Sequence, residues 1–329
     1  MSTKILILRF SSIGDIVLTT PVVRCLKQQI EDAEVHYVTK LKFAPILQAN
    51  PYIEKLHFLR DKLADLLPQL EAEKFDYIID LHKNFRSYRI RQRLHVPSRS
   101  FKKLNFKKWL LVNFKINRMP DIHIVDRYLD TVRFLKVAND HKGLDYFIPS
   151  GEEYNFKKLP GSFHSGYLAV VIAGTYVTKR LPVKKILETC SCIDIPVVLI
   201  GGKREIPEGL ELIRHLKAKG FNLVGKTSLN ESASLVRSAA LVMTNDTGLM
   251  HIAAAFRKKI LSFWGNTVPS FGMTPYFADP SSKMIEAGDI KCRPCSKLGK
   301  SRCPKKHFRC MNDISVDEAV IWIRETMKS

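Results

Sequence analysis

The sequence predicts an α/β protein with two domains, each built on a parallel β-sheet covered by helices. Three observations carry this prediction. Short apolar runs of strand length alternate with amphipathic stretches of helical periodicity along the chain. The alternation restarts after residues 148–166, a segment rich in Pro and Gly that is typical of a linker. A chain of 329 residues with 45% hydrophobic residues is long enough for two separate cores.

Both predicted domains have a Rossmann-like order of elements. In the first, residues 1–150, the candidate strands are residues 4–9, 35–39, 55–59 and 77–81, and the candidate helices are residues 15–30, 62–73 and 122–137. In the second, residues 166–314, the candidate strands are residues 168–173, 197–201, 222–224, 240–243 and 260–264. A last helix is predicted over residues 315–329, with Ser315 as N-cap and Glu318 completing a capping box. Alternation of this kind places ligands at the carboxyl ends of the strands.

The composition indicates a cytoplasmic protein. No apolar run approaches the roughly 20 residues of a membrane span, and the N-terminal run at residues 5–8 is too short for a signal peptide. The seven cysteines are an odd number, and Cys25 and Cys190 fall at apolar helix positions, as expected where thiols stay reduced.

A strand-to-helix junction at residues 242–255 is the most informative segment. An apolar run breaks at Asn-Asp-Thr-Gly and resumes at helical spacing, so Asp246, Thr247 and Gly248 begin a helix that also carries His251 on its first turn. Free N–H groups and the partial positive charge of a helix N-terminus suit a phosphate, and Gly248 allows close approach. Simple helix capping by Asp246 or Thr247 explains the same residues.

A second junction of this type follows the first predicted strand. Ser-Ser-Ile-Gly-Asp leads from residues 5–10 into an amphipathic stretch, which places Asp15 at the carboxyl end of that strand. A carboxylate at this edge is a candidate for chemistry, and capping is again the alternative. In the second domain, Lys179 and Arg180 occupy one βα connection, where cations could neutralise a diphosphate. Glu205 lies in the next, after two glycines, where it could accept from ribose hydroxyls.

The net charge of +21 is concentrated in one stretch. Residues 83–118 hold twelve Lys or Arg and no Asp or Glu, interleaved with aromatic residues. This pattern predicts an anionic partner, which could be nucleic acid, the phosphate surface of a membrane or a phosphorylated glycolipid. A merely solvated basic surface is the alternative.

Four late cysteines form a separate candidate site. Cys292, Cys295, Cys303 and Cys310 have the spacing C-x2-C-x7-C-x6-C. Four thiolates can close a structural zinc site, but the second half is not a tight pair, so reduced thiols without metal are an equal alternative.

Taken together, the motifs resemble those of glycosyltransferase family 9, the ADP-heptose:lipopolysaccharide heptosyltransferases. The residues that carry the resemblance are R-F-S-S-I-G-D-I-V near the start, A-G-T-Y-V-T-K-R-L-P at the second domain's opening, T-N-D-T-G-L-M-H-I-A-A-A, and W-G-N-T-V-P. The resemblance implies a GT-B fold, in which two Rossmann-like domains face a central cleft. It also implies inverting transfer of heptose from ADP-heptose to the lipopolysaccharide inner core, without a catalytic metal. Asn266 departs from the family, which more often has Pro there.

The resemblance also assigns roles by motif. Asp15 matches the general base and Lys179 a catalytic ligand of the donor phosphate. The donor-binding set that it implies is Gly14, Thr175, Lys179, Glu205, Asp246, Thr247, Gly248, Leu249 and His251. The acceptor would then be bound by the basic stretch, through Lys83, Arg86, Lys102, Lys103, Lys107 and Lys108. An anionic glycolipid acceptor predicts a peripheral enzyme at the cytoplasmic face of the inner membrane.

Three alternatives stay open. Another nucleotide-linked sugar could be the donor. A nucleic-acid-binding protein would explain the basic stretch but not the carboxylates at two sheet edges, so no nucleic-acid partner is expected. A nicotinamide enzyme would share the architecture, but no G-x-G-x-x-G follows the first strand of either domain.

Overall fold

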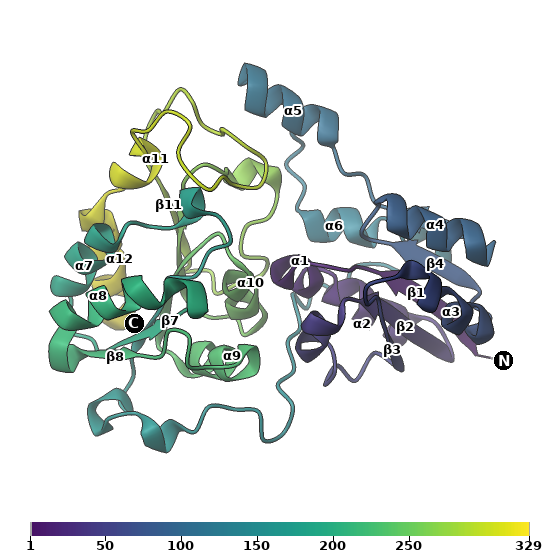
Figure 1. Ribbon diagram of the computed structural model, residues 1–329, viewed down its shortest axis with the longest axis horizontal. Coiled ribbons are helices and arrows are strands. Elements are labelled where there is room, and N and C mark those ends of the chain that lie inside the picture. Colours follow the sequence, from purple (N-terminus) through teal and green to yellow (C-terminus); the bar gives the residue numbers. More distant parts are fainter. Residues whose placement is uncertain (1, 329) are drawn as a thin grey trace. The chain divides into compact units, whose positions relative to one another are not determined.

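A computed structural model describes residues 2–328 as two compact α/β units (Figure 1). Unit 1 contains residues 2–103 and Ile122–Pro149, and unit 2 contains Leu104–Asp121 and residues 150–328. Met1 and Ser329, which end the predicted ranges 1–150 and 315–329, lie outside the described residues. Within residues 2–328, no helix combines the length and apolarity needed to cross a bilayer.

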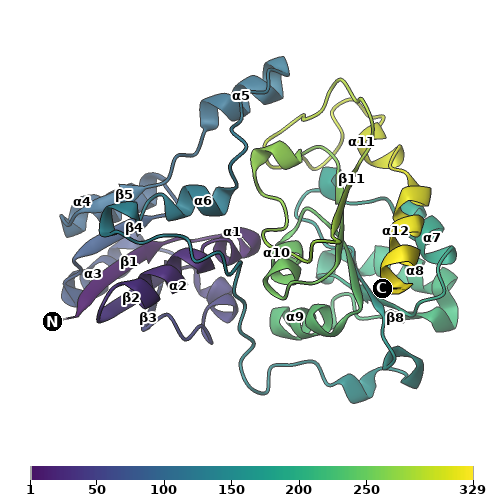
Figure 2. The same ribbon diagram turned by 180° about the vertical axis from the view of Figure 1, so that it is seen from behind.

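Unit 1 is built on a five-stranded, fully parallel sheet of order β3-β2-β1-β4-β5. Its strands are β1 (Thr3–Leu8), β2 (Ala33–Thr39), β3 (Lys55–Phe58), β4 (Tyr77–Asp80) and β5 (Ser98–Ser100). Its main helices are α1 (Ile13–Val17), α2 (Thr20–Gln29), α3 (Leu67–Glu73), α4 (Phe85–Leu94) and α6 (Ile124–Leu129). Helices α2 and α6 pack together, as do α3 and α4, and the two pairs cover opposite faces of the sheet (Figures 1 and 2).

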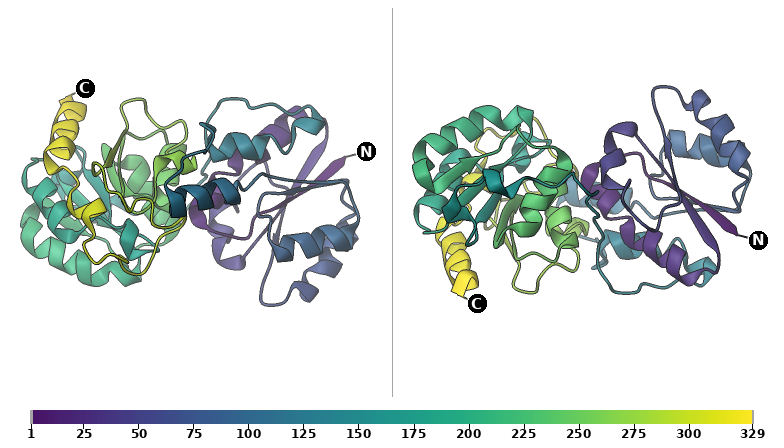
Figure 3. Two further views of the ribbon diagram at one scale, coloured as in Figure 1. Left: turned by 90° about the horizontal axis from the view of Figure 1, so that it is seen from above. Right: turned by 90° about the horizontal axis from the view of Figure 1, so that it is seen from below.

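Unit 2 is built on a six-stranded parallel sheet of order β11-β10-β9-β6-β7-β8. Its strands are β6 (Leu168–Val171), β7 (Val197–Ile200), β8 (Gly220–Asn222), β9 (Leu241–Asn245), β10 (Ile260–Trp264) and β11 (Lys283–Glu286). Its helices are α5 (Asn105–Phe114), α7 (Val183–Ser191), α8 (Ile206–Leu216), α9 (Leu229–Ser238), α10 (Gly248–Ala255), α11 (Arg309–Asn312) and α12 (Val316–Lys328). Helix α7 packs against α8 and α12, and α9 packs against α10 (Figure 3).

The predicted α/β class and parallel sheets are confirmed, and the strands in both halves agree with the prediction to within a few residues. The elements that the prediction missed include strands β5 and β11 and helices α4 and α5. The helix expected over residues 15–30 is broken between α1 and α2. The hydroxyls of Thr19 and Thr20 donate to backbone carbonyls three residues earlier, at 2.6 and 2.8 Å, and Pro21 lies in the first turn of the second helix.

The predicted domain boundaries need two corrections. Residues 104–121 were assigned to the first domain, but α5 belongs to unit 2, because Lys115 donates to the backbone oxygens of Cys292 and Pro294 at 3.2 and 2.8 Å. The last helix was separated from the second domain, but α12 buries Ala319 and Ile323 in the core of unit 2. Periodicity finds helices but does not show which core receives their apolar face.

Candidate functional site

Asp15 lies on α1, just beyond the carboxyl end of β1. Its Oδ2 accepts hydrogen bonds from the Ser12 N–H at 3.1 Å and from the Ser12 hydroxyl at 2.7 Å. Its Oδ1 lies 2.6 Å from Nη2 of Arg9. The Asp15 side chain remains 24% exposed, so the carboxylate caps the helix and is still open to a ligand. The capping and chemical interpretations of Asp15 are therefore compatible.

Arg9 is the residue that holds Asp15, and no motif in the sequence selects it. Its side chain is only 9% exposed. Its Nε donates to the Ser11 carbonyl at 2.8 Å and its Nη1 donates to the Tyr128 hydroxyl at 3.0 Å. Burial is the largest single effect on the pKa of Arg9 and lowers it, but Asp15, Tyr128 and Tyr37 together outweigh burial, so the pKa is raised and the guanidinium stays charged. The only available signal was a charged residue that ends an apolar strand.

His82 and Lys103 add polar groups around Asp15. The His82 ring packs on Phe10 with centroids 4.7 Å apart. Burial, and then the charges of Arg9 and Lys103, lower the pKa of His82 to about 3, so the ring is neutral at pH 7. Its Nδ1 is buried and has no hydrogen-bond partner among residues 2–328. Burial also lowers the pKa of Lys103. His82 and Lys103 are thus within electrostatic reach of the Asp15 carboxylate, and Arg9 contacts it directly.

Asp80 is a second organising residue that the sequence did not reveal. This carboxylate ends β4 and is almost fully buried. It accepts from the N–H groups of His82 at 3.0 Å and Lys83 at 2.6 Å, and from the Ser87 hydroxyl at 2.9 Å. Asp80 therefore fixes the turn that carries Lys83 and the start of α4.

In unit 2 the predicted junction lies where expected, between β9 and α10. Thr247 is at the N-cap position of α10, but its side chain makes no capping hydrogen bond. Asp246 does not cap the helix either: its Oδ2 lies 2.5 Å from Nζ of Lys179 and accepts from the Thr267 hydroxyl at 2.9 Å. His251, also on α10, is buried. Two segments far apart in sequence thus place a cation beside a helix N-terminus.

Arg180 and Glu205 form an adjacent network. Nη2 of Arg180 lies 2.5 Å from Glu205 Oε1, and its Nε donates to the Gly174 carbonyl at 2.8 Å. Glu205 is buried, and its Oε2 accepts from the Gly202 N–H at 3.0 Å. A Cβ at Gly174 would lie 2.9 Å from Arg180 Cγ, so glycine allows this close packing. Glu205 thus shapes the loop, and its ribose contact stays a prediction.

The remaining predicted donor residues lie in three different segments. Gly14 is buried in α1 of unit 1, whereas Thr175 is exposed after β6. Gly248 and Leu249 are the first residues of α10. Asn266 stands where the family more often has Pro. Its side chain is buried, and its Nδ2 donates to the Ser296 hydroxyl at 3.0 Å.

The basic stretch is divided between the two units. Lys83, Arg86, Lys102 and Lys103 belong to unit 1, and Lys107 and Lys108 lie on α5 in unit 2. Nζ of Lys108 lies 5.6 Å above the Phe271 ring. The aromatic residues Phe106, Trp109 and Phe114 of α5 are exposed and contact one another, with ring centroids 6.0 and 5.1 Å apart. Helix α5 therefore presents aromatic rings and lysines on one element.

The four late cysteines do not converge on one point in the described chain. Within residues 2–328, one group of at least three His, Cys, Asp or Glu side chains has its ligand atoms within 4.8 Å of one another. That group does not include these cysteines. Cys310 is buried, and burial followed by the neighbouring thiols raises its pKa to about 12. Sγ of Cys292 lies 3.7 Å from His307 Nε2. The thiols of Cys292, Cys295 and Cys303 all act on that of Cys310, so structural zinc and metal-free thiols both stay open.

Two parallel α/β units, one with a carboxylate after its first strand and the other with a cation beside a helix N-terminus, are the arrangement expected of glycosyltransferases with the GT-B fold. A sequence model of glycosyltransferase family 9 (heptosyltransferase) matches residues 63–306. The chain therefore belongs to glycosyltransferase family 9.

Individual relatives agree over nearly the whole length. Lipopolysaccharide heptosyltransferase 1 of Campylobacter coli is 25% identical over 346 residues, covering 98% of each chain. The family 9 glycosyl transferase of Veillonella parvula has a similar fold, with a TM-score of 0.79, 21% identity, and coverage of 99% of this chain and 98% of the other. Escherichia coli ADP-heptose LPS heptosyltransferase II gives a TM-score of 0.75 at 20% identity, covering 99% of each chain.

Proposed function

We propose that this enzyme transfers heptose from ADP-heptose to the inner core of lipopolysaccharide, with inversion at the anomeric carbon. The family supports heptosyl transfer, and the named relatives act in lipopolysaccharide synthesis. The observation that carries the proposal is Asp15, a partly exposed carboxylate kept in place by the buried Arg9. A hydroxyl acceptor needs such a group, since an uncharged sugar hydroxyl is a weak nucleophile.

In the proposed mechanism, Asp15 removes the proton from the acceptor hydroxyl as that oxygen attacks the anomeric carbon of the donor. The bond to the ADP phosphate breaks on the opposite face, which inverts the configuration. Arg9 and Ser12 fix the direction of the carboxylate through the contacts on its two oxygens. A general base must be ionised, and Arg9 places a positive charge 2.6 Å from the Asp15 carboxylate.

The departing ADP gains negative charge, and unit 2 supplies the groups proposed to stabilise it. Lys179 and the N–H groups at the start of α10 lie at the same sheet edge. Preorganised donors of this kind contribute on the order of 3 kcal/mol each to a transition state. Asp246 balances the charge of Lys179 in the resting protein, and the incoming diphosphate would share that lysine. We therefore expect catalysis without a metal; any metal bound by Cys292–Cys310 would be structural.

The basic stretch is proposed to bind the anionic acceptor at the cytoplasmic face of the inner membrane. Lys103 has its pKa affected by both Arg9 and Asp15, so it lies within electrostatic reach of the proposed base. The exposed rings of α5 suit the headgroup region of a bilayer, where aromatic side chains insert shallowly.

The decisive experiment measures ADP release and acceptor mass with purified enzyme and ADP-heptose. Two acceptors should be compared: a heptose-free lipopolysaccharide core and one that already carries its first heptose. We expect one of them to gain a single heptose in the absence of divalent cations. Transfer from a different nucleotide sugar, with no turnover of ADP-heptose, would assign the enzyme to the alternative donor class.

A further inference from the structure

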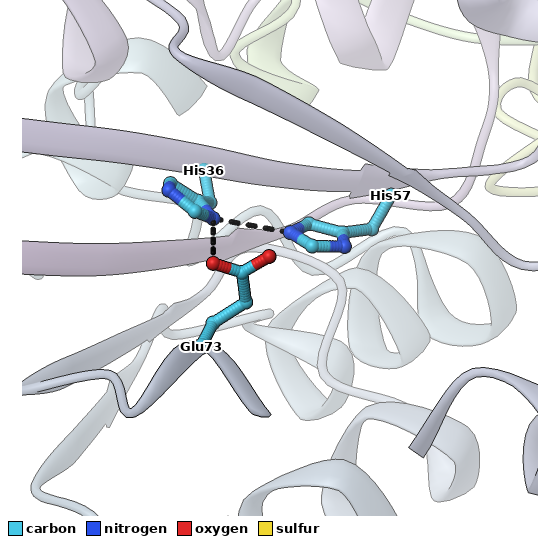
Figure 4. Close-up of side chains that lie close together, drawn as sticks. All are labelled: His36, His57 and Glu73. Atoms are coloured by element: carbon cyan, nitrogen blue, oxygen red, sulfur yellow. Dashed lines mark hydrogen bonds and ion pairs between the residues drawn. The ribbon is translucent and has the colours of Figure 1, made fainter. Parts of the chain in front are cut away.

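Three potential metal ligands converge inside unit 1, away from the proposed transfer site. They are His36 on β2, His57 on β3 and Glu73, the last residue of α3 (Figure 4). Nδ1 of His36 lies 3.1 Å from Nε2 of His57 and 3.9 Å from Oε2 of Glu73. The three ligand atoms all lie within 4.8 Å of one another, as in no other group in residues 2–328.

The sheet register explains why the two rings meet. Strands β2 and β3 are parallel, with His36 opposite Lys55 and Val38 opposite His57. Because side chains alternate between faces, His36, Val38 and His57 share one face of the sheet. Both imidazoles are only 3% exposed. Helix α3 lies over this face, and its last residue brings the Glu73 carboxylate to the pair.

We propose that His36, His57 and Glu73 bind one divalent transition-metal ion of the zinc type. Imidazole nitrogens and a carboxylate oxygen are common ligands of such ions. Tetrahedral Zn–N bonds of about 2.0–2.1 Å put two nitrogens about 3.3 Å apart. The observed separation of 3.1 Å between the His36 and His57 nitrogens is close to that value. Glu73 needs only a small side-chain rotation to complete the set, because its carboxylate already faces His36 in Figure 4.

The surroundings restrict the movement of the ligands. Phe75 packs edge-on against both rings, with centroids 5.1 and 6.2 Å away, which limits their rotation. Nζ of Lys55 lies 2.5 Å from Glu73 Oε1, which leaves Oε2 for the metal.

The carboxylate of Glu34 also lies near the second ring nitrogen of His36. Oε2 of Glu34 lies 3.9 Å from Nε2 of His36, on the side of the ring away from His57. A carboxylate beside the second nitrogen of a ligating histidine orients the ring and makes it a stronger ligand. The lysines near this cluster, Lys4 and Lys55, oppose a cation but are each paired with a glutamate.

The inferred role of the ion is structural. It would join α3 to two adjacent strands, whereas Asp15 follows the carboxyl end of β1. Metal at this site would therefore raise the stability of unit 1 without taking part in transfer. Metal binding here depends only on the contacts within the cluster, so it is independent of the proposed transferase reaction.

The test uses Zn²⁺ alone with the full-length, chelator-treated protein. One equivalent should raise the melting temperature, and the zinc X-ray absorption spectrum should show nitrogen and oxygen ligands at about 2.0–2.1 Å. Glu73→Gln keeps the size of the side chain and should weaken zinc binding roughly tenfold or more. His57→Phe should weaken it further. His95→Asn, which changes an exposed histidine of the same unit, is the matched control and should bind zinc normally.

Two results would overturn the inference. Sulfur ligands at about 2.3 Å would assign the ion to the cysteines instead. Unchanged zinc affinity in Glu73→Gln and His57→Phe, with both proteins folded by circular dichroism, would leave only a hydrogen-bonded histidine pair. If His57→Phe does not fold, Glu73→Gln decides the question alone, since Glu73 lies at a helix end and is partly exposed.

Discussion

Arg9 and Asp15 form an ion pair in which one partner is buried and the other reaches solvent. The distance from Nη2 to Oδ1 is 2.6 Å, and the two side chains are 9% and 24% exposed. Arg9 is also held by the Ser11 carbonyl and the Tyr128 hydroxyl, so the guanidinium has little freedom to move. The base proposed for catalysis is therefore oriented from inside the fold, and the acceptor can approach it from outside.

Replacing Asp15 by Asn should lower turnover at least about a hundredfold, because the amide cannot accept the acceptor's proton. The donor constant should change little, since the proposed ADP-binding groups lie in unit 2. Steady-state kinetics with both substrates varied measure the two effects. Asp61→Asn, an exposed carboxylate of the same unit, is the matched control. Near-normal turnover in Asp15→Asn would remove Asp15 from the mechanism.

ADP should raise the melting temperature in the presence of EDTA, because Lys179 and the start of α10 supply the positive charge that a metal otherwise provides. A nucleotide at a hundred times its dissociation constant stabilises a protein by about 2.7 kcal/mol. Lys179→Ala should lose most of this shift, whereas Lys184→Ala, an exposed lysine on α7, should keep it. Activity abolished by EDTA and restored by Mg²⁺ would show that the metal-free mechanism is wrong.

Unit 1 should lose stability as the pH falls below about 6.5. The pKa of His82 is lowered to about 3 in the folded protein, so between that value and the unfolded pKa near 6.5 only the unfolded chain takes up a proton. After allowance for solvent screening, this proton uptake lowers the free energy of unfolding by about 1–2 kcal/mol at pH 5. Urea unfolding at pH 7 and pH 5 measures the loss, which His82→Gln should reduce. Equal pH dependence in the parent and variant would contradict the assignment to His82.

Neutralising Lys102, Lys103, Lys107 and Lys108 together should abolish sedimentation with anionic vesicles and raise the apparent acceptor constant. Each Lys near an anionic surface contributes about 1 kcal/mol, so four are enough to hold the enzyme. ADP binding should stay intact. The control carries the same number of substitutions at the exposed residues Lys157, Lys158, Lys184 and Lys305. Equal vesicle binding by both variants at low salt would identify the stretch as a solvated surface.

The sequence predicts best what depends on local periodicity. The strand before Asp15 and the junction at Asp246 were located correctly, because apolar runs and turn residues mark them. The partners of those residues were not predictable in the same way. Arg9 and Lys179 reach Asp15 and Asp246 only through tertiary folding, and an ion pair leaves no periodic pattern.

The pairing of His36 with His57 escaped prediction for a related reason. The two residues are 21 positions apart and meet only through the register of β2 and β3. Register depends on side-chain packing across the sheet, which a single sequence does not display. The prediction that residues 104–121 belong to the first domain failed similarly, since the contacts of α5 come from residues far along the chain.

Helix α5 has a consequence for synthesis on the ribosome. Lys108 precedes Phe271, the ring that it covers, by about 160 residues. At typical elongation rates of 5–20 residues per second, the partners of α5 are synthesised roughly 10–30 seconds after α5 itself. During that interval Phe106, Trp109 and Phe114 are attached to a nascent chain whose second unit does not yet exist. These exposed rings are therefore accessible to chaperones before the enzyme has finished folding.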